Sequence, residues 1–89
     1  MIRTKSGYSL RQVLDAYLIL GAGKEAYAPR CIMSMNESGA FLWHLLENGA
    51  EKDELVQRMT QEYDVPADTA AADVEKFLAQ LREKALIVE

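Results

Sequence analysis

The chain has one cysteine and one histidine, Cys31 and His44, and such residues can together form a nucleophile and its base. A working pair needs hydrogen-bond contact and usually a third group that orients the base. Cys31 lies in an expected strand and His44 in an expected helix, and neither their spacing nor a neighbour supplies that arrangement. We therefore expect His44 at the surface and Cys31 as a small apolar residue. No catalytic residue is predicted.

Metal and phosphate chemistry are also not indicated by the sequence. A structural zinc site needs roughly four clustered cysteine or histidine ligands, and the chain has one of each. The stretch Gly21-Ala22-Gly23-Lys24 lacks the spacing and the following helix of a phosphate-binding loop. The many carboxylates fall at expected helix starts and outer helix faces, where water solvates them. We predict no metal site and no cofactor.

The first third of the chain has the patterns of β-strands. Alternation of apolar and polar residues predicts a strand from Tyr8 to Val13, and Leu14-Asp15 can turn the chain. The run from Ala16 to Leu20 is apolar on both faces, which is typical of a central strand. A third strand is expected from Arg30 to Met35. Short connections favour antiparallel order, so we expect a three-stranded antiparallel sheet.

The remainder of the chain has apolar residues at helical spacing, which predicts helices over residues 37–46, 52–63 and 67–84. A short closing strand is expected over residues 86–88. The predicted class is α+β and winged helix-turn-helix-like, an N-terminal three-stranded antiparallel sheet followed by a three-helix bundle. We expect one domain spanning residues 1–89, with its strands over 8–35 and its helices over 37–84.

The junction between the third strand and the first helix has a clear capping signal. Asn36 can accept hydrogen bonds from the free N–H groups of a helix that begins at Glu37. At the other end, Asn48-Gly49 suits a left-handed helix cap. Trp43 lies among other apolar residues of this helix, so we interpret it as a core anchor.

The sequence does not determine which face of the third strand packs against the helices. Simple alternation places Cys31, Met33 and Met35 on one face and Ile32 and Ser34 on the other. One set must face the helices, and the pattern alone leaves open whether the methionines belong to the core or to a binding surface.

Composition bounds the location and partners of the chain. Its 89 residues contain 49% hydrophobic residues, enough for a packed core. No apolar run approaches the roughly 20 residues that span a bilayer, and the N-terminus lacks the apolar centre of a secretory signal. A single cysteine cannot form an internal disulfide. We expect a cytoplasmic protein that does not bind membranes.

The net charge of −4 is unevenly distributed. Residues 1–35 contain five basic and two acidic residues, whereas residues 36–89 contain five basic and twelve acidic residues. A winged-helix DNA-binding transcription regulator is the alternative function for this predicted fold, but recognition helices need basic or amide side chains aimed at bases. Neither later helix has a basic face, so we expect no nucleic-acid binding, whereas the basic first third can attract an acidic peptide.

Residues 35–46, Met-Asn-Glu-Ser-Gly-Ala-Phe-Leu-Trp-His-Leu-Leu, closely resemble a signature of the PqqD family of peptide chaperones, also called RiPP recognition elements. That signature is Leu-Asn-x-Thr-Gly-Ala-x-Ile-Trp-x-Leu-Leu, and this chain has Met for Leu, Ser for Thr and Leu for Ile. The resemblance continues through Asn48-Gly49 and the stretch 73–81, and covers nearly the whole chain. Ala50-Glu51 departs from it, because the family often has a threonine cap there.

The resemblance implies a non-catalytic module that binds the leader segment of a ribosomally synthesised precursor peptide. It also implies a modifying enzyme as second partner, often a radical S-adenosylmethionine (SAM) protein. The leader would add as a strand beside the third strand, in the groove between that strand and the third helix. An unpaired edge can also pair with itself, which would give a homodimer. The implied peptide-binding residues are Arg30, Cys31, Ile32, Met33, Ser34, Met35, Ala70, Asp73, Val74, Phe77, Gln80 and Leu81.

Overall fold

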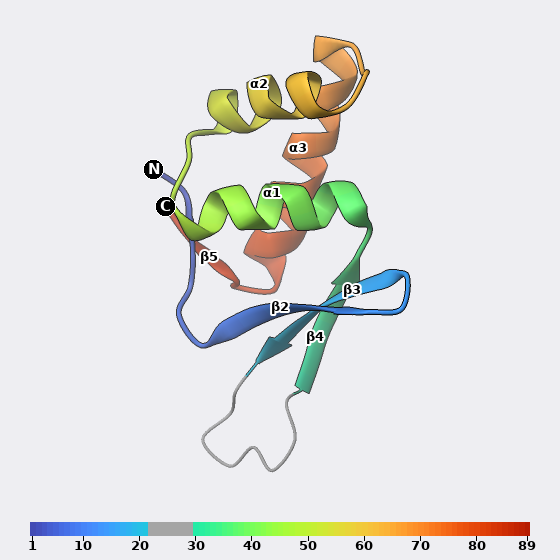
Figure 1. Ribbon diagram of the computed structural model, residues 1–89. Coiled ribbons are helices and arrows are strands. Elements are labelled where there is room, and N and C mark those ends of the chain that lie inside the picture. Colours follow the sequence, from blue (N-terminus) through green and yellow to red (C-terminus); the bar gives the residue numbers. More distant parts are fainter. Residues whose placement is uncertain (22–29) are drawn as a thin grey trace.

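A computed structural model describes residues 1–21 and 30–89 of the chain. Three antiparallel strands are followed by three helices, as the sequence predicts, and a pair of two-residue strands joins the two ends of the chain (Figure 1). In chain order the elements are β1 (Arg3–Thr4), β2 (Tyr8–Val13), β3 (Ala16–Gly21), β4 (Arg30–Met35), α1 (Glu37–Glu47), α2 (Lys52–Glu62), α3 (Ala67–Glu83) and β5 (Ile87–Val88).

The main sheet has the order β2-β3-β4, so the apolar strand β3 is central, as predicted. A register shift interrupts the pairing of β3 with β4: Ile19 pairs with Met33, but Leu20 pairs with Cys31. Ile32 is therefore the extra residue of a β-bulge, and two successive residues of a bulged strand oppose one residue of its partner.

The bulge changes which side chains of β4 share a face. Ile32, Met33 and Met35 all pack against the hydrophobic core, whereas Cys31 and Ser34 are exposed. The predicted alternation, with Cys31 beside the two methionines and Ile32 on the opposite face, is wrong for this reason. Cys31, which the sequence analysis expected as a small apolar residue, is exposed.

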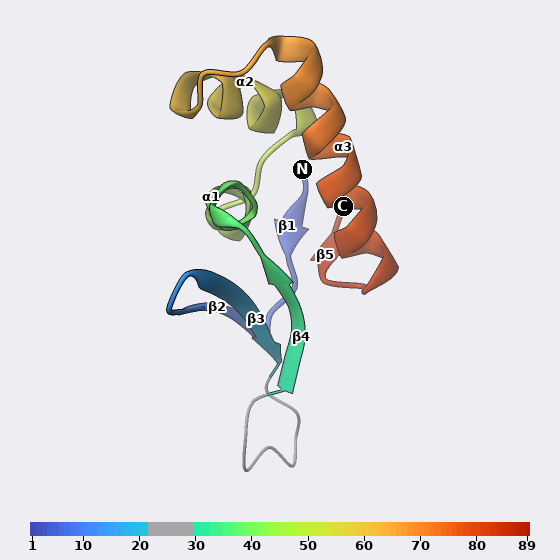
Figure 2. The ribbon, with the colours of Figure 1, turned by 90° about the vertical axis from the view of Figure 1, so that its right-hand side faces the viewer.

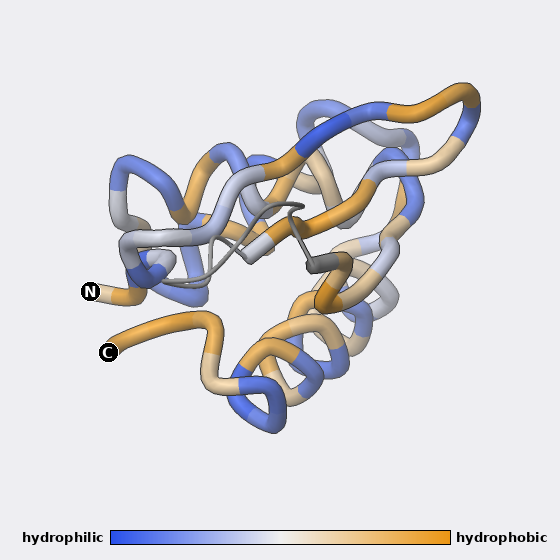
Figure 3. Tube along the Cα trace, turned by 90° about the horizontal axis from the view of Figure 1, so that it is seen from below, coloured by the Kyte–Doolittle hydropathy of each residue, from blue (hydrophilic) through white to orange (hydrophobic). Residues whose placement is uncertain are grey.

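Leu14 sits at the tip of the β2–β3 hairpin with a backbone φ of 56° and a side chain that is 90% exposed. Figure 3 shows this tip as an apolar end that projects from the rest of the chain. A left-handed φ costs an L-residue about 1–2 kcal/mol, and glycine avoids most of that cost. The predicted turn at Leu14-Asp15 is therefore present, but in a strained form.

We expect Leu14→Gly to stabilise the protein by roughly 0.5–1 kcal/mol, because the relief of strain exceeds the extra chain entropy of glycine. Thermal denaturation would detect this as a higher Tm. Val13→Gly is the matched control, since Val13 is an ordinary strand residue and its replacement should lower the Tm. A lower Tm for Leu14→Gly would contradict the strain argument.

Both predicted caps of α1 are confirmed. The side chain of Asn36 accepts a hydrogen bond from the backbone N–H of Gly39 at 3.0 Å. At the other end Gly49 has a φ of 86°, and its N–H donates to the carbonyl of Leu46 at 3.0 Å. These caps fix where the helix starts after β4 and therefore how the two elements lie relative to each other.

The hydrophobic core lies between the inner face of the main sheet and the three helices (Figures 1 and 2). Trp43 is fully buried, which confirms it as a core anchor. Ile87 of β5 belongs to the same core, as does Ile2, which precedes β1 and forms a β-bridge with Ala50. The sequence predicted a closing strand at this end, but it did not predict β1 as its partner. The other largest fully buried side chains are Ile19, Leu42, Leu46, Leu55, Leu78, Leu81, Leu86 and Val74.

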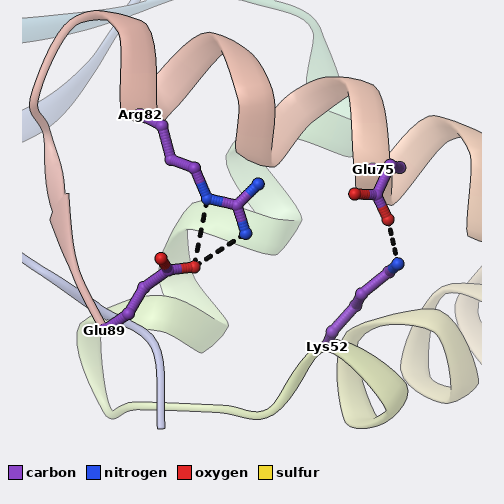
Figure 4. Close-up of polar contacts among 4 residues, drawn as sticks. All are labelled: Lys52, Glu75, Arg82 and Glu89. Atoms are coloured by element: carbon purple, nitrogen blue, oxygen red, sulfur yellow. Dashed lines mark hydrogen bonds and ion pairs between the residues drawn. The ribbon is translucent and has the colours of Figure 1, made fainter.

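Two surface ion pairs hold the helices and the chain end in place (Figure 4). Lys52 pairs with Glu75 and joins α2 to α3. Arg82 donates two hydrogen bonds to Glu89 Oε1, from Nε at 3.1 Å and from Nη2 at 2.7 Å, and these bonds lower the pKa of the Glu89 carboxyl. Among the described residues, no helix has the length and apolarity that a membrane crossing requires.

Candidate functional site

Strand β4 forms one edge of the main sheet. Its inner side pairs with β3, and no other strand of the described part of the chain pairs with its outer side. In Figure 2 the lower part of helix α3 lies on the outer side of β4, at the end of the strand that leads into α1. The open ladder that the sequence resemblance requires is therefore present.

The register indicates which residue of β4 directs its backbone groups outward. The two-residue turn at Leu14-Asp15 makes Val13 and Ala16 the hydrogen-bonding pair next to it, and such pairs alternate along an antiparallel ladder. Tyr17 and Ile19 of β3 then direct their backbone groups toward Met35 and Met33 of β4. We infer that Ser34, which lies between these two methionines, directs its N–H and C=O to the open edge.

A groove of about 470 Å³ lies beside this edge, between β4, the first turn of α1 and the facing flank of α3. This volume is in the range of about 300–1,000 Å³ typical of ligand sites. The lining is apolar at Met33, Met35, Leu42, Met59 and Phe77, and polar or small at Ser34, Asn36, Ser38, Gly39, Asp73, Lys76 and Gln80.

The floor of the groove is continuous with the hydrophobic core. Leu42, Met59 and Phe77 are 2%, 5% and 8% exposed, so they are held by core packing. Met33 and Met35 are partly buried and lie nearer the open edge. A side chain entering the groove would thus meet a rigid apolar base and a softer apolar wall.

The structure brings half of the predicted binding residues together around this groove. Met33, Ser34, Met35, Asp73, Phe77 and Gln80 line it. Ala70, Val74 and Leu81 are completely buried on the inner side of α3 and do not line it.

The three remaining predicted residues belong to the first half of β4. Cys31 is exposed, and Ile32 packs against the core without lining the groove. The backbone of Arg30 lies in β4, but its side chain is outside the described part of the structure.

Sequence reasoning missed six residues of the lining, namely Asn36, Ser38, Gly39, Leu42, Met59 and Lys76. A signal for Lys76 was present, because residues 73, 76, 77 and 80 follow the i, i+3, i+4, i+7 spacing of one helix flank. Asn36, Ser38 and Gly39 belong to the capping segment, which was interpreted only as a helix start. Met59 comes from α2, and no local pattern connects it to β4.

Gly39 of α1 lies close to side chains of both β4 and α3. A Cβ atom at this position would lie 3.0 Å from the Cβ of Met35 and 3.4 Å from Cε1 of Phe77. Both neighbours line the groove. The absence of a side chain at Gly39 therefore sets the spacing between the strand edge and the two helices.

We expect Gly39→Ala to destabilise the protein by up to about 2 kcal/mol, because the cost of overpacking exceeds the gain of about 1 kcal/mol in helix propensity. The same displacement of Met35 and Phe77 should weaken peptide binding. Thermal denaturation and a peptide titration would measure the two effects. A Gly39→Ala variant with raised stability and unchanged affinity would show that a Cβ at this position fits beside Met35 and Phe77 without displacing them.

Among the described residues, the ionisable side chains that line the groove are Asp73 and Lys76. Neither Cys31 nor His44 is among its lining residues. His44 is exposed, as predicted, and its Nδ1 lies 2.7 Å from Glu47 Oε1. No group of three or more potential metal ligands occurs within residues 1–21 and 30–89.

Comparison with known proteins gives a consistent picture. The family model described as Coenzyme PQQ synthesis protein D (PqqD) matches residues 26–87. No curated protein matches the chain. A solved structure described as TbiB1 in complex with the TbiA(beta) leader peptide is 25% identical, with a TM-score of 0.73 over 96% of this chain and 93% of that chain.

A second solved structure, described as lasso peptide synthetase B1 complexed with the leader peptide, has a TM-score of 0.72 over 99% of this chain and 98% of that chain. At 19% identity it supports the fold alone. The family match covers more than half of the sequence and includes β4, the three helices and every residue that lines the groove. The chain belongs to the PqqD family, whose members are RiPP recognition elements.

Proposed function

We propose that this protein is a non-catalytic module that captures the leader segment of a ribosomally synthesised precursor peptide and presents it to a modifying enzyme. The observation that carries the proposal is the open edge of β4 beside a groove with an apolar base and a polar rim. The similar solved structure at 25% identity is described as a complex with a leader peptide, which supports the same class of ligand here.

The physical basis of binding is strand addition. An extended peptide beside β4 would form backbone hydrogen bonds at the edge, which give affinity independent of sequence. Alternate side chains of the peptide would enter the groove, and each large apolar side chain buried there contributes roughly 1.5–3 kcal/mol. The peptide-binding set that we propose is therefore the backbone of β4 together with the groove-lining flank of α3.

A direct titration tests this proposal. Fluorescently labelled leader segments of candidate precursor peptides encoded near this chain's gene would be titrated with the protein, and micromolar or tighter binding is expected for the cognate peptide. A scrambled leader of the same composition is the control for non-specific association. Random duplex DNA in the same assay should give no salt-dependent binding, whereas such binding would favour the transcription-regulator alternative.

The second partner, a modifying enzyme such as a radical SAM protein, rests on the family resemblance. We propose that the two partners meet in the cytoplasm, where precursor peptides are synthesised. Modification of the precursor by the purified enzyme should accelerate when this protein is added. The acceleration should vanish when the precursor lacks its leader. Equal rates with and without the protein would contradict the presentation role.

We also propose that a homodimer competes with the leader, because the same edge of β4 can pair with a second copy. Sedimentation of the protein at increasing concentration would detect a dimer. Addition of cognate leader should then return the protein to monomer. A dimer that persists at saturating leader would place the self-association at another surface.

A further inference from the structure

The groove contains three of the chain's four methionines, Met33, Met35 and Met59. They come from two elements, β4 and α2, that are separated in the sequence. Methionine is unbranched, has a polarisable sulfur and adopts many side-chain conformations, so it adapts to differently shaped apolar partners. A groove lined by several methionines can therefore adapt to apolar side chains of different shapes.

The geometry of strand addition determines how many peptide side chains reach these methionines. Residues directly opposite each other on neighbouring strands have side chains on the same face of the sheet. Peptide residues opposite Met33 and Met35 would therefore face the groove, whichever direction the peptide runs. The peptide residue between them, opposite Ser34, would face the exposed side of the sheet together with Ser34.

We infer that the groove selects leaders by two large apolar side chains placed two residues apart, and that its methionines make this selection tolerant of which apolar side chains they are. The inference rests on the proposed function and specifies the ligand of that site. The leader would be recognised by an apolar–x–apolar pattern, and its other residues in the added strand could vary.

The remaining lining residues agree with an apolar pair. Leu42 and Phe77 supply a fixed apolar base, which favours any large hydrocarbon side chain over a polar one. The ionisable lining residues, Asp73 and Lys76, are exposed and of opposite charge, so they give the rim no strong preference for a charge of one sign. A charged peptide side chain at either groove-facing position would lose hydration without gaining a partner at the base.

The experiment is a selection from a display library of random 12-residue peptides with the purified protein as bait. We expect enrichment of two large apolar residues two positions apart, with Leu, Ile, Met and Phe all represented. In follow-up titrations of an enriched peptide, exchanges among these four residues should change Kd by less than about ten-fold. A rigid apolar pocket would give roughly 10–200-fold for a single methylene. A charged residue at either position should abolish measurable binding.

A variant with all three groove methionines replaced by leucine tests the role of methionine directly. Leucine has nearly the same volume, so the fold should persist, while its branched side chain adapts less. We expect this variant to discriminate among the four apolar residues by more than ten-fold. Met1→Leu is the matched control, because Met1 is 66% exposed and outside the groove lining, and it should bind like the wild type.

The outcomes separate the inference from the proposed function. If no peptide is enriched, and candidate precursor leaders also fail to bind, the proposed function itself is wrong. If peptides bind but show one required residue at a groove-facing position, or no pattern with two-residue spacing, the function stands and the inference is overturned. The inference is also overturned if the leucine variant is as tolerant as the wild type.

Discussion

Replacing Ser34 by proline is expected to weaken leader binding by roughly 30-fold or more while the protein remains folded. Proline removes the N–H that Ser34 directs to the open edge, and its ring occupies the space where a peptide strand would approach. The lost hydrogen bond and the unpaired carbonyl left on the peptide together cost about 2–4 kcal/mol. Because Ser34 is exposed and its backbone groups point away from β3, the substitution should lower the stability of the sheet only slightly.

Gln12→Pro is the matched control for this variant. Gln12 is exposed and lies opposite Tyr17, so the same alternation directs its backbone groups to the other edge of the sheet, on β2, with which no further strand in the described part of the chain pairs. Both substitutions place a proline at an outward-facing position of an edge strand, but only one of them lies beside the groove. Circular dichroism would establish that both variants fold, and titration with the same labelled leader would compare their affinities.

Two results would contradict the expectation. A folded Ser34→Pro protein that binds the leader as tightly as the wild type would exclude pairing at the outer edge of β4. Equal weakening by Gln12→Pro would indicate a general effect of proline on the sheet. The first result would point to a binding surface away from the groove, whereas the second would remove the support that the proline variant gives to edge pairing.

The largest effect on stability is expected for Trp43→Ala, which should cost about 3–5 kcal/mol and leave much of the protein unfolded. Trp43 is fully buried and its side chain is the largest in the core. Its removal would leave a cavity among Leu42, Leu46 and the residues of the neighbouring elements. Chemical denaturation followed by far-UV circular dichroism would measure the loss.

Trp43→Phe separates packing from hydrogen bonding at the same position. The Nε1–H group of Trp43 is buried and has no hydrogen-bond partner among residues 1–21 and 30–89, and a buried unpaired donor costs about 1–3 kcal/mol. Phenylalanine retains an aromatic ring and removes that donor, so the stability lost through its smaller volume is partly offset. We expect Trp43→Phe to destabilise by less than half as much as Trp43→Ala. Both variants remove the N–H, so the size of the Trp43→Phe loss is the test. A loss larger than the smaller ring volume accounts for would indicate that the indole N–H is satisfied in solution.

Local signals in the sequence were sufficient for the order and type of the main elements. The helix caps at Asn36 and Gly49 are short-range features, so their positions follow from residue type alone. The same holds for Trp43, which lies in an apolar stretch that repeats at helical spacing. The strand β1 has two residues, too few to show alternation, and its pairing with β5 depends on the fold of everything between them.

The binding site was less predictable because it depends on a bulge and on contacts distant in sequence. A bulge at Ile32 exchanges the expected faces of Cys31 and Ile32 relative to the rest of β4, and the residue types at this position do not predict it. The inward flank of α3 was identified correctly as apolar, but the groove is lined by the adjacent flank, on which Lys76 lies. Met59 reaches the groove through the packing of α2 against the other helices, which only the three-dimensional arrangement reveals.

The central claim is that an extended leader pairs with the outer edge of β4, and amide hydrogen exchange at Ser34 measures this most directly. The exchange rate would be recorded by NMR with and without a saturating cognate leader. Strand addition predicts strong slowing of exchange at Ser34 and no change at Gln12 on the opposite edge. Unchanged exchange at Ser34 in a saturated complex would contradict the claim, because the peptide would then bind without occupying the open ladder.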